Sequence, residues 1–153
     1  TIYCAPLSGA HLFFMDKQAT LNLLQERCVD TLVDTLGVTF VELGDDYLVA
    51  KMPVTSVVHQ VDGVLHGGAT AALAETVGSA ACSIFCKSGD VIMRGIEVSA
   101  NHVRGVHDGF VYAKATATHM GKTMQHWSIQ ITDDSDKLVS SCKLTTLILP
   151  KKK

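Results

Sequence analysis

The residue best suited to chemistry is Glu75, a carboxylate in a stretch that carries no other charge. Every other side chain from Gly67 to Cys86 is uncharged, and most are small. Burying an unpaired carboxylate costs free energy, so its presence here requires a reason. The surroundings favour a general base or nucleophile in a partly apolar cleft. The alternative is a helix face exposed to water, where glutamate is ordinary.

Ser79 lies one helical turn after Glu75, on the same face of the predicted helix. Residues four apart in a helix are neighbours, so its hydroxyl can hold the carboxylate or a water molecule. A serine hydroxyl that bonds back to the helix carbonyls is the competing interpretation.

Upstream of Glu75, His66, Gly67 and Gly68 stand where the same helix is predicted to begin. The first backbone N–H groups of a helix lack intrahelical partners and lie at the positive end of its dipole. Such donors can stabilise an oxyanion, and glycine lets a substrate approach the main chain closely. A tight turn explains the glycine pair equally well, in which case His66 is a buried histidine and Gln60 a loop amide.

Helical geometry separates His66 from Glu75. Their positions differ by nine residues, which at ~1.5 Å per residue is about 13.5 Å, and nine steps of ~100° place them on opposite faces. One chain therefore cannot bring both to one atom. If both serve one site, two helices must lie antiparallel about a two-fold axis, which predicts a homodimer with two equivalent sites.

The composition is that of a globular domain. The chain has 153 residues, of which 47% are hydrophobic and 18% charged, with a net charge of -2. We expect one domain over residues 1–153, with an N-terminal extension over 1–20 and a basic tail over 151–153. The charge argues against nucleic-acid binding, and Glu75 with several glycines argues against a membrane span. Nothing marks the chain for export, so a cytoplasmic location is expected.

Metal binding is not expected. No CxxC pair is present, and the histidines fall on separate predicted strands or turns with spacings that match no common ligand pattern. The cysteines are expected to be reduced and mostly buried. They are Cys4, Cys28, Cys82, Cys86 and Cys142.

Hydrophobic periodicity predicts the order helix, two strands, helix, four strands. The helices are expected over 21–36, ended by Gly37, and over 67–86. The predicted strands are 38–43, 47–52, 91–101, 110–119, 123–132 and 138–149, with a turn at 88–90 before the third. The short turns favour antiparallel neighbours, so the expected class is α+β.

The segment LHGGATAALAET (residues 65–76), with Gln60 before it and Ser79 after it, resembles the active-site segment of hot-dog-fold acyl-CoA thioesterases. The similarity is strongest to the 4-hydroxybenzoyl-CoA (PaaI-like) branch with a glutamate on the helix. That branch includes 1,4-dihydroxy-2-naphthoyl-CoA thioesterases and proofreading aryl thioesterases of enterobactin synthesis. The resemblance implies a hot-dog fold, in which a curved antiparallel sheet wraps a long central helix, and assembly into homodimers and often homotetramers.

The resemblance also assigns roles. Glu75 would be the base or nucleophile, the Gly67 N–H would polarise the thioester carbonyl, His66 and Gln60 would orient the thioester or water, and Ser79 would assist Glu75. The expected contacts to the substrate and its coenzyme A portion are Gly68, Arg94, His102, Arg104, His119, Gly121, Lys122 and Thr123. Coenzyme A is here part of the substrate, so no separate cofactor is implied.

The predicted function is hydrolysis of an aromatic or medium-sized acyl-CoA to the free acid and CoA. A thiolate is a good leaving group, so one carboxylate and one oxyanion donor suffice; attack by water and a mixed anhydride on Glu75 both fit. The alternatives are a proofreading hydrolase for acyl-carrier proteins, a dehydratase or hydratase of the same fold, and a non-catalytic acyl-CoA binding module.

Overall fold

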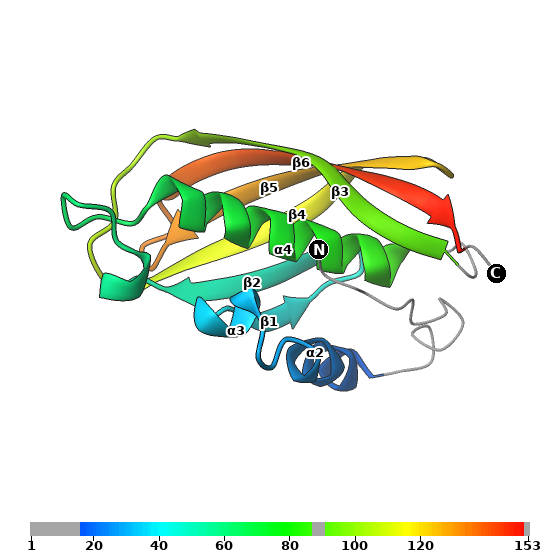
Figure 1. The fold of residues 1–153 in the computed structure, drawn as a ribbon, viewed down its shortest axis with the longest axis horizontal. Helices are drawn as coiled ribbons and strands as arrows, with labels where there is room; N and C mark the ends of the chain where they lie inside the picture. The colour runs from blue at the N-terminus through cyan, green and yellow to red at the C-terminus, as the bar shows by residue number, and fades with distance from the viewer. Residues whose placement is uncertain (1–15, 87–90, 152–153) are drawn as a thin grey trace.

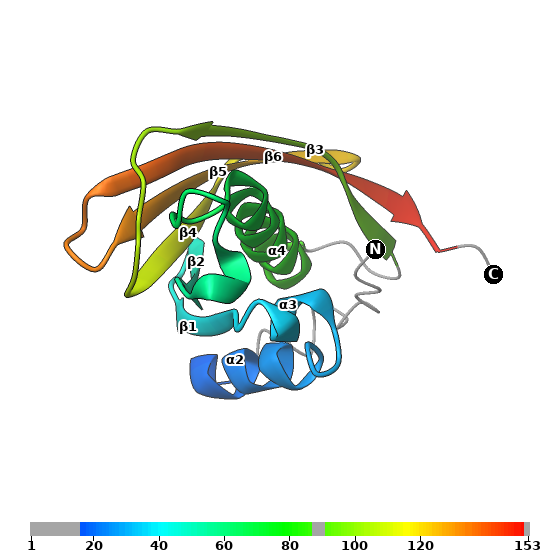
Figure 2. The ribbon, with the colours of Figure 1, turned by 60° about the vertical axis from the view of Figure 1, so that its left-hand side comes forward.

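A long helix, α4 (Gly67–Phe85), lies against the concave face of a six-stranded antiparallel sheet in the computed structural model, which describes residues 16–86 and 91–151. Figure 2 views α4 nearly end-on and shows the sheet curving over it, with two short helices at the open side of the curve. The α+β class and the wrapped central helix are confirmed. The predicted turn at 88–90, most of the N-terminal extension and Cys4 lie outside the described residues.

All six predicted strands are present, with ends displaced by no more than one residue. Their order in the sheet is β1-β2-β4-β5-β6-β3, so β1 and β3 are the edges. The bounds are β1 (Thr39–Leu43), β2 (Tyr47–Pro53), β3 (Val91–His102), β4 (Phe110–Met120), β5 (Met124–Asp133) and β6 (Leu138–Pro150). Alternating burial along β4 and β5 explains why period two predicted them well.

The first helix differs from the prediction. The apolar spacing predicted one helix over 21–36, whereas the chain forms two, α2 (Lys17–Glu26) and α3 (Leu32–Thr35). Between them Asp30 has a φ of 59°, a left-handed conformation that interrupts a right-handed helix. Both helices bury apolar side chains in the same core, so the apolar spacing continues across a break that it does not reveal.

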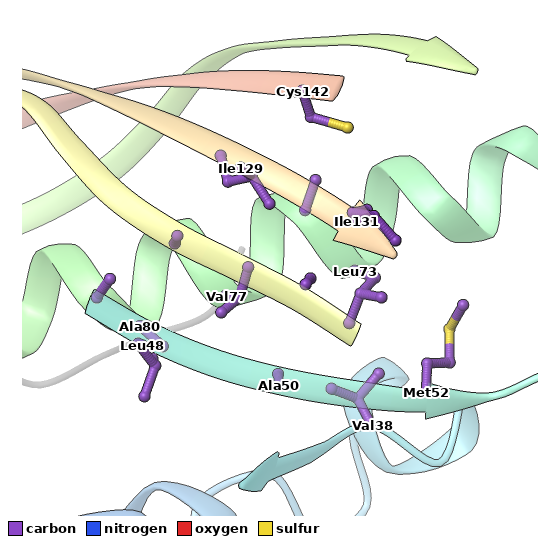
Figure 3. Close-up of a cluster of buried hydrophobic side chains, with 14 of the residues drawn as sticks. Val38, Leu48, Ala50, Met52, Leu73, Val77, Ala80, Ile129, Ile131 and Cys142 are labelled. Atoms are coloured by element: carbon purple, nitrogen blue, oxygen red, sulfur yellow. The ribbon is translucent and has the colours of Figure 1, made fainter. Parts of the chain in front are cut away.

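Small residues let α4 approach the sheet closely. A Cβ atom placed on Gly78 would lie 2.5 Å from Leu144 Cδ2 of β6, so only glycine fits there without displacement. Leu73 and Val77 of α4 point into the core formed with β2 and β5, where Leu48 and Ile129 are fully buried (Figure 3). This close contact fixes the height and rotation of α4 on the sheet, and so the direction of its polar side chains.

The four described cysteines are free thiols, three of them buried and Cys28 half-buried, as expected. Burial raises the pKa of the Cys142 thiol above its usual value, which keeps it protonated and unreactive at neutral pH. None of the described helices is long and apolar enough to cross a membrane.

Candidate active site

Glu75 is half-buried on α4, and its carboxylate has a defined partner. Its Oε1 accepts a hydrogen bond of 3.1 Å from the Ser79 hydroxyl. The spacing of four residues predicted this contact, and the hydroxyl is turned toward the carboxylate rather than back to the helix carbonyls. Ser79 therefore fixes the orientation of the carboxylate.

Glu75 lines a cavity of about 690 Å³, a size typical of small-molecule sites. Its walls come from α4, from β3 and from the segment that contains α2 and α3, with one residue each from β1 (Phe40) and β6 (Thr146). The apolar wall residues include Leu24, Leu32, Val33, Phe40, Ala72 and Met93. Among the described residues that line it, Glu75 is the only carboxylate, so an acyl group held in this cavity would lie beside the one side chain able to act as a base.

Strand β3 passes directly beneath the carboxylate. A Cβ atom placed on Gly95 would lie 2.7 Å from Glu75 Oε1, too close for any other residue type without movement of the carboxylate. The pairing of β3 with β6 also shifts register between Gly95 and Glu97. The absence of a side chain at Gly95 thus makes room for Glu75.

At the other end of the predicted site, His66 caps the start of α4. Its Nδ1 accepts a hydrogen bond of 2.7 Å from the Gly68 N–H, which places the proton of the neutral ring on Nε2. The Gly68 N–H is therefore already used. The Gly67 N–H donates to no acceptor among the described residues, so Gly67 is the donor available to a substrate oxygen.

Gly67 lines a second cavity, of about 340 Å³, together with His102 and Arg104. A Cβ atom on Gly67 would lie 2.8 Å from His102 Nε2. The other ring nitrogen of His102 shares a hydrogen bond of 3.1 Å with the Ser140 hydroxyl, which holds the imidazole in place. Two of the predicted coenzyme A contacts thus lie beside the proposed oxyanion donor.

Gly67 and Glu75 line two different cavities. The helical spacing predicted that one chain cannot bring the two ends of the motif to one atom, and the structure agrees. Gln60 and His66 line neither cavity; the backbone of Gln60 forms a turn with Gly63 and Val64.

The predicted coenzyme A contacts are likewise divided between two ends of the sheet. The turn at 121–123 lies beside β6, where the Thr123 carbonyl accepts from the Ile148 N–H at 2.8 Å. Arg94 of β3 pairs with Leu147 of β6, near this turn, and lines the Glu75 cavity. His119, just before the turn, lies beside His126 with ring centroids 5.8 Å apart. His102 and Arg104 lie at the far end of β3.

No pattern in the sequence indicates the wall contributed by residues 24–40 or the contact at Gly95. Apolar periodicity indicates that a helix has a buried face, but not which site that face borders. In 16–86 and 91–151, no three or more His, Cys, Asp or Glu residues are grouped so as to hold a metal ion.

Comparisons with known proteins identify relatives over most of the chain. Residues 62–140 match the Thioesterase superfamily. The proofreading thioesterase EntH of Cronobacter sakazakii is 41% identical over 133 residues, which cover 87% of this chain and 96% of EntH. The crystal structure of a Haemophilus influenzae thioesterase superposes with a TM-score of 0.81 at 37% identity, covering 85% of this chain and 90% of that one.

A Staphylococcus aureus thioesterase superposes with a TM-score of 0.74 at 35% identity, covering 78% of this chain and 98% of that one. Its structures include a glutamine-to-alanine variant and a glutamate-to-alanine variant. The two substituted positions are 15 residues apart, the same separation as Gln60 and Glu75 here.

Proposed function

Because the chain belongs to the Thioesterase superfamily and is a thioester hydrolase, we propose that it hydrolyses acyl-CoA thioesters with Glu75 as base or nucleophile. The observation that carries this proposal is the position of Glu75. It is the only carboxylate among the described residues that line a largely apolar cavity of about 690 Å³, and Ser79 holds it in one orientation. A thioester carbonyl carbon placed beside it would be open to attack.

The proposed chemistry needs two groups. Either a water molecule gives its proton to Glu75 as it attacks the carbonyl carbon, or the carboxylate attacks and forms a mixed anhydride that water then cleaves. In both routes negative charge develops on the carbonyl oxygen, where the Gly67 N–H at the start of α4 would stabilise it. The C–S bond then breaks, and coenzyme A leaves as a thiolate.

The relatives support the choice of residues. The S. aureus thioesterase has been varied at a glutamine and a glutamate with the separation of Gln60 and Glu75. We propose that Gln60 and His66 orient the thioester or the attacking water from the loop and the helix start.

We propose that the site is completed by a second copy of the chain, paired along β3. Among the described strands, β3 pairs only with β6, so its outer edge can accept another strand, and it exposes 52% of Ile96 and 40% of Val98. Glu75 lies over Gly95, and Gly67 lies against His102. If two β3 strands pair antiparallel with Gly95 opposite His102 of the partner subunit, Glu75 and the partner subunit's Gly67 face one site.

The same pairing brings together the predicted coenzyme A contacts, which lie at two opposite ends of the sheet within one chain. The turn at 121–123 lies at the Gly95 end of its own sheet, so it would meet His102 and Arg104 of the partner subunit. We propose that coenzyme A lies across this junction, with Lys122 and Arg104 near its phosphates. A homotetramer of two such dimers stays a prediction.

The test of the function is release of free thiol from a panel of acyl-CoAs: benzoyl, hydroxybenzoyl, naphthoyl, phenylacetyl and straight-chain. We expect turnover of at least one member, with a clear ranking that identifies the acyl class. Tight binding of acyl-CoA without turnover of any member would contradict the proposal and favour a binding module.

The dimer makes a separate prediction at Ser99. With the bulge between Gly95 and Glu97 counted as one step, the proposed register puts the two-fold axis at Ser99, so the two copies of this residue lie directly opposite each other on one face, within disulfide range. We expect Ser99→Cys to form a disulfide-linked dimer under mild oxidation, seen by electrophoresis without reductant. Val41→Cys is the control, because Val41 is 40% exposed but lies on the opposite edge strand, β1. Equal cross-linking of both variants, or none at residue 99, would contradict this pairing.

A further inference from the structure

Ser140 is fully buried on β6, and its hydroxyl has three hydrogen-bonding neighbours. It donates at 3.1 Å to the carbonyl of Asn101, a group that can only accept. Its Oγ also lies 3.1 Å from His102 Nδ1 and 3.2 Å from Cys142 Sγ. A hydroxyl has one hydrogen, which Asn101 receives, so Ser140 must accept hydrogen bonds from the other two neighbours.

These three contacts determine which nitrogen of the His102 ring carries the hydrogen. The Cys142 thiol keeps its hydrogen and can donate it, because burial raises the pKa of this thiol above its usual value. His102 Nδ1 must likewise carry a hydrogen, which it donates to Ser140. In the neutral ring the other nitrogen, Nε2, then has a lone pair and no hydrogen. Ser140 therefore holds His102 in the form that accepts hydrogen bonds at Nε2.

His102 Nε2 faces the start of α4. It is the ring atom nearest to the space in front of Gly67, 2.8 Å from the position of a Cβ atom there, and both residues line the cavity of about 340 Å³. No described residue donates a hydrogen bond to this nitrogen. The cavity therefore presents a donor, the Gly67 N–H, beside an acceptor, His102 Nε2.

Stabilisation of the oxyanion does not require this acceptor. The carbonyl oxygen needs hydrogen-bond donors as it gains negative charge, and a lone pair offers it none. An acceptor beside the oxyanion donor suits instead an N–H group of the substrate. In a coenzyme A thioester, two methylene groups separate the sulfur from the first amide of the pantetheine arm. With the thioester oxygen on the Gly67 N–H, this amide would lie in the same cavity.

Given the proposed acyl-CoA hydrolysis, on which this inference rests, we propose that His102 Nε2 accepts a hydrogen bond from the first amide N–H of the pantetheine arm, and that Ser140 is the positioning residue that makes this possible. The pair then recognises the thiol part of the substrate, whatever the acyl group. An arm with an ester oxygen in place of the N–H would set two lone pairs against each other and leave Nε2 without a partner.

The test compares two small thioesters of the best acyl group, made with N-acetylcysteamine and with 2-mercaptoethyl acetate, which differ only in an N–H against an oxygen. The measured quantity is the ratio of kcat/KM for the amide over the ester, divided by the ratio of their hydrolysis rates in base without enzyme. We expect about 10- to 100-fold for the native protein and about one for His102→Leu. His102→Gln keeps an acceptor and is expected to retain part of the preference.

Ser140→Ala removes the acceptor for the Nδ1 hydrogen and is expected to lower the ratio about tenfold. Nitrogen NMR of protein labelled in histidine gives a readout that does not depend on activity. We expect the His102 hydrogen on Nδ1 in the native protein and a shift toward Nε2 in Ser140→Ala. Ser141→Ala is the matched control, because Ser141 is the next residue of β6 and its hydroxyl accepts from Gln130 on the opposite face of the sheet. It should leave both measurements unchanged.

A native ratio of about one, or a hydrogen on Nε2 of His102 in the native protein, would overturn the proposal. So would an equal loss on both thioesters in His102→Leu, which would give His102 a purely structural role. Glu75→Ala separates the two levels: if it spares hydrolysis, the proposed function fails, whereas loss of hydrolysis in Glu75→Ala without any amide preference in the native protein removes only this inference.

Discussion

Replacing Glu75 with alanine is expected to lower turnover of the best acyl-CoA substrate by about 10²- to 10⁴-fold, the range typical of a lost general base. The expected loss is large because the other described residues around this cavity include no carboxylate that could substitute. Ser79→Ala removes the 3.1 Å hydrogen bond that orients the carboxylate but leaves the carboxylate itself, so its effect should be smaller, about tenfold. Thiol release under saturating substrate measures both.

Glu42→Ala is the control for loss of a carboxylate, because Glu42 is exposed on β1, away from both cavities. It should retain native turnover. Binding of acyl-CoA to the Glu75→Ala protein should persist, since the acyl and coenzyme A contacts remain. Retention of turnover in Glu75→Ala would contradict the assignment of this residue.

The second large effect is a recovery of activity from two inactive proteins. Gly67→Val puts a side chain where a Cβ would already lie 2.8 Å from His102 Nε2, so it should block the oxyanion donor without touching Glu75. If each site takes Glu75 from one protomer and Gly67 from the other, a mixed dimer of Glu75→Ala and Gly67→Val chains has one intact site and one doubly defective site. Random reassortment makes half the dimers mixed, so about a quarter of native activity should return.

The measurement is thiol release after the two variants are unfolded together and refolded, or coexpressed with different tags. Each variant treated alone is the control and should stay inactive, and both should match the native protein in circular dichroism and in size by gel filtration. Failure of the mixture to exceed its components would show that each chain contains a whole site.

Much of the fold follows from local patterns. Buried and exposed residues alternate along β4 and β5, as the sequence pattern predicts, because one face of the sheet covers α4 and the other is more exposed. The segment 67–86, in which Glu75 is the one charged residue, was predicted as a single helix and forms α4, which ends one residue earlier. The break at Asp30 was not predictable in the same way, because its left-handed φ depends on how α3 folds back onto the core rather than on apolar spacing.

Contacts between residues of α4 could be predicted from the sequence, whereas contacts between α4 and other elements could not. A helix fixes the angle between its own residues, so the pairing of Glu75 with Ser79 and the separation of Glu75 from Gly67 follow from counting. The position of Gly95 beneath the carboxylate, and that of Arg27 in the wall of the same cavity, depend on tertiary contacts between distant segments. No periodicity in one sequence encodes which strand passes under which helix turn.

The walls of the Glu75 cavity come from stretches of chain that are distant in the sequence. Glu75, Ser79 and Arg94 fall within residues 62–140, which match the superfamily model, whereas the wall from Leu24 to Phe40 precedes them, within the part of the chain that is similar to EntH. A substitution in this short N-terminal wall changes the shape of the cavity and leaves Glu75 and Ser79 in place. Diversification of acyl preference among descendants of one ancestor would then leave its record in residues 24–40.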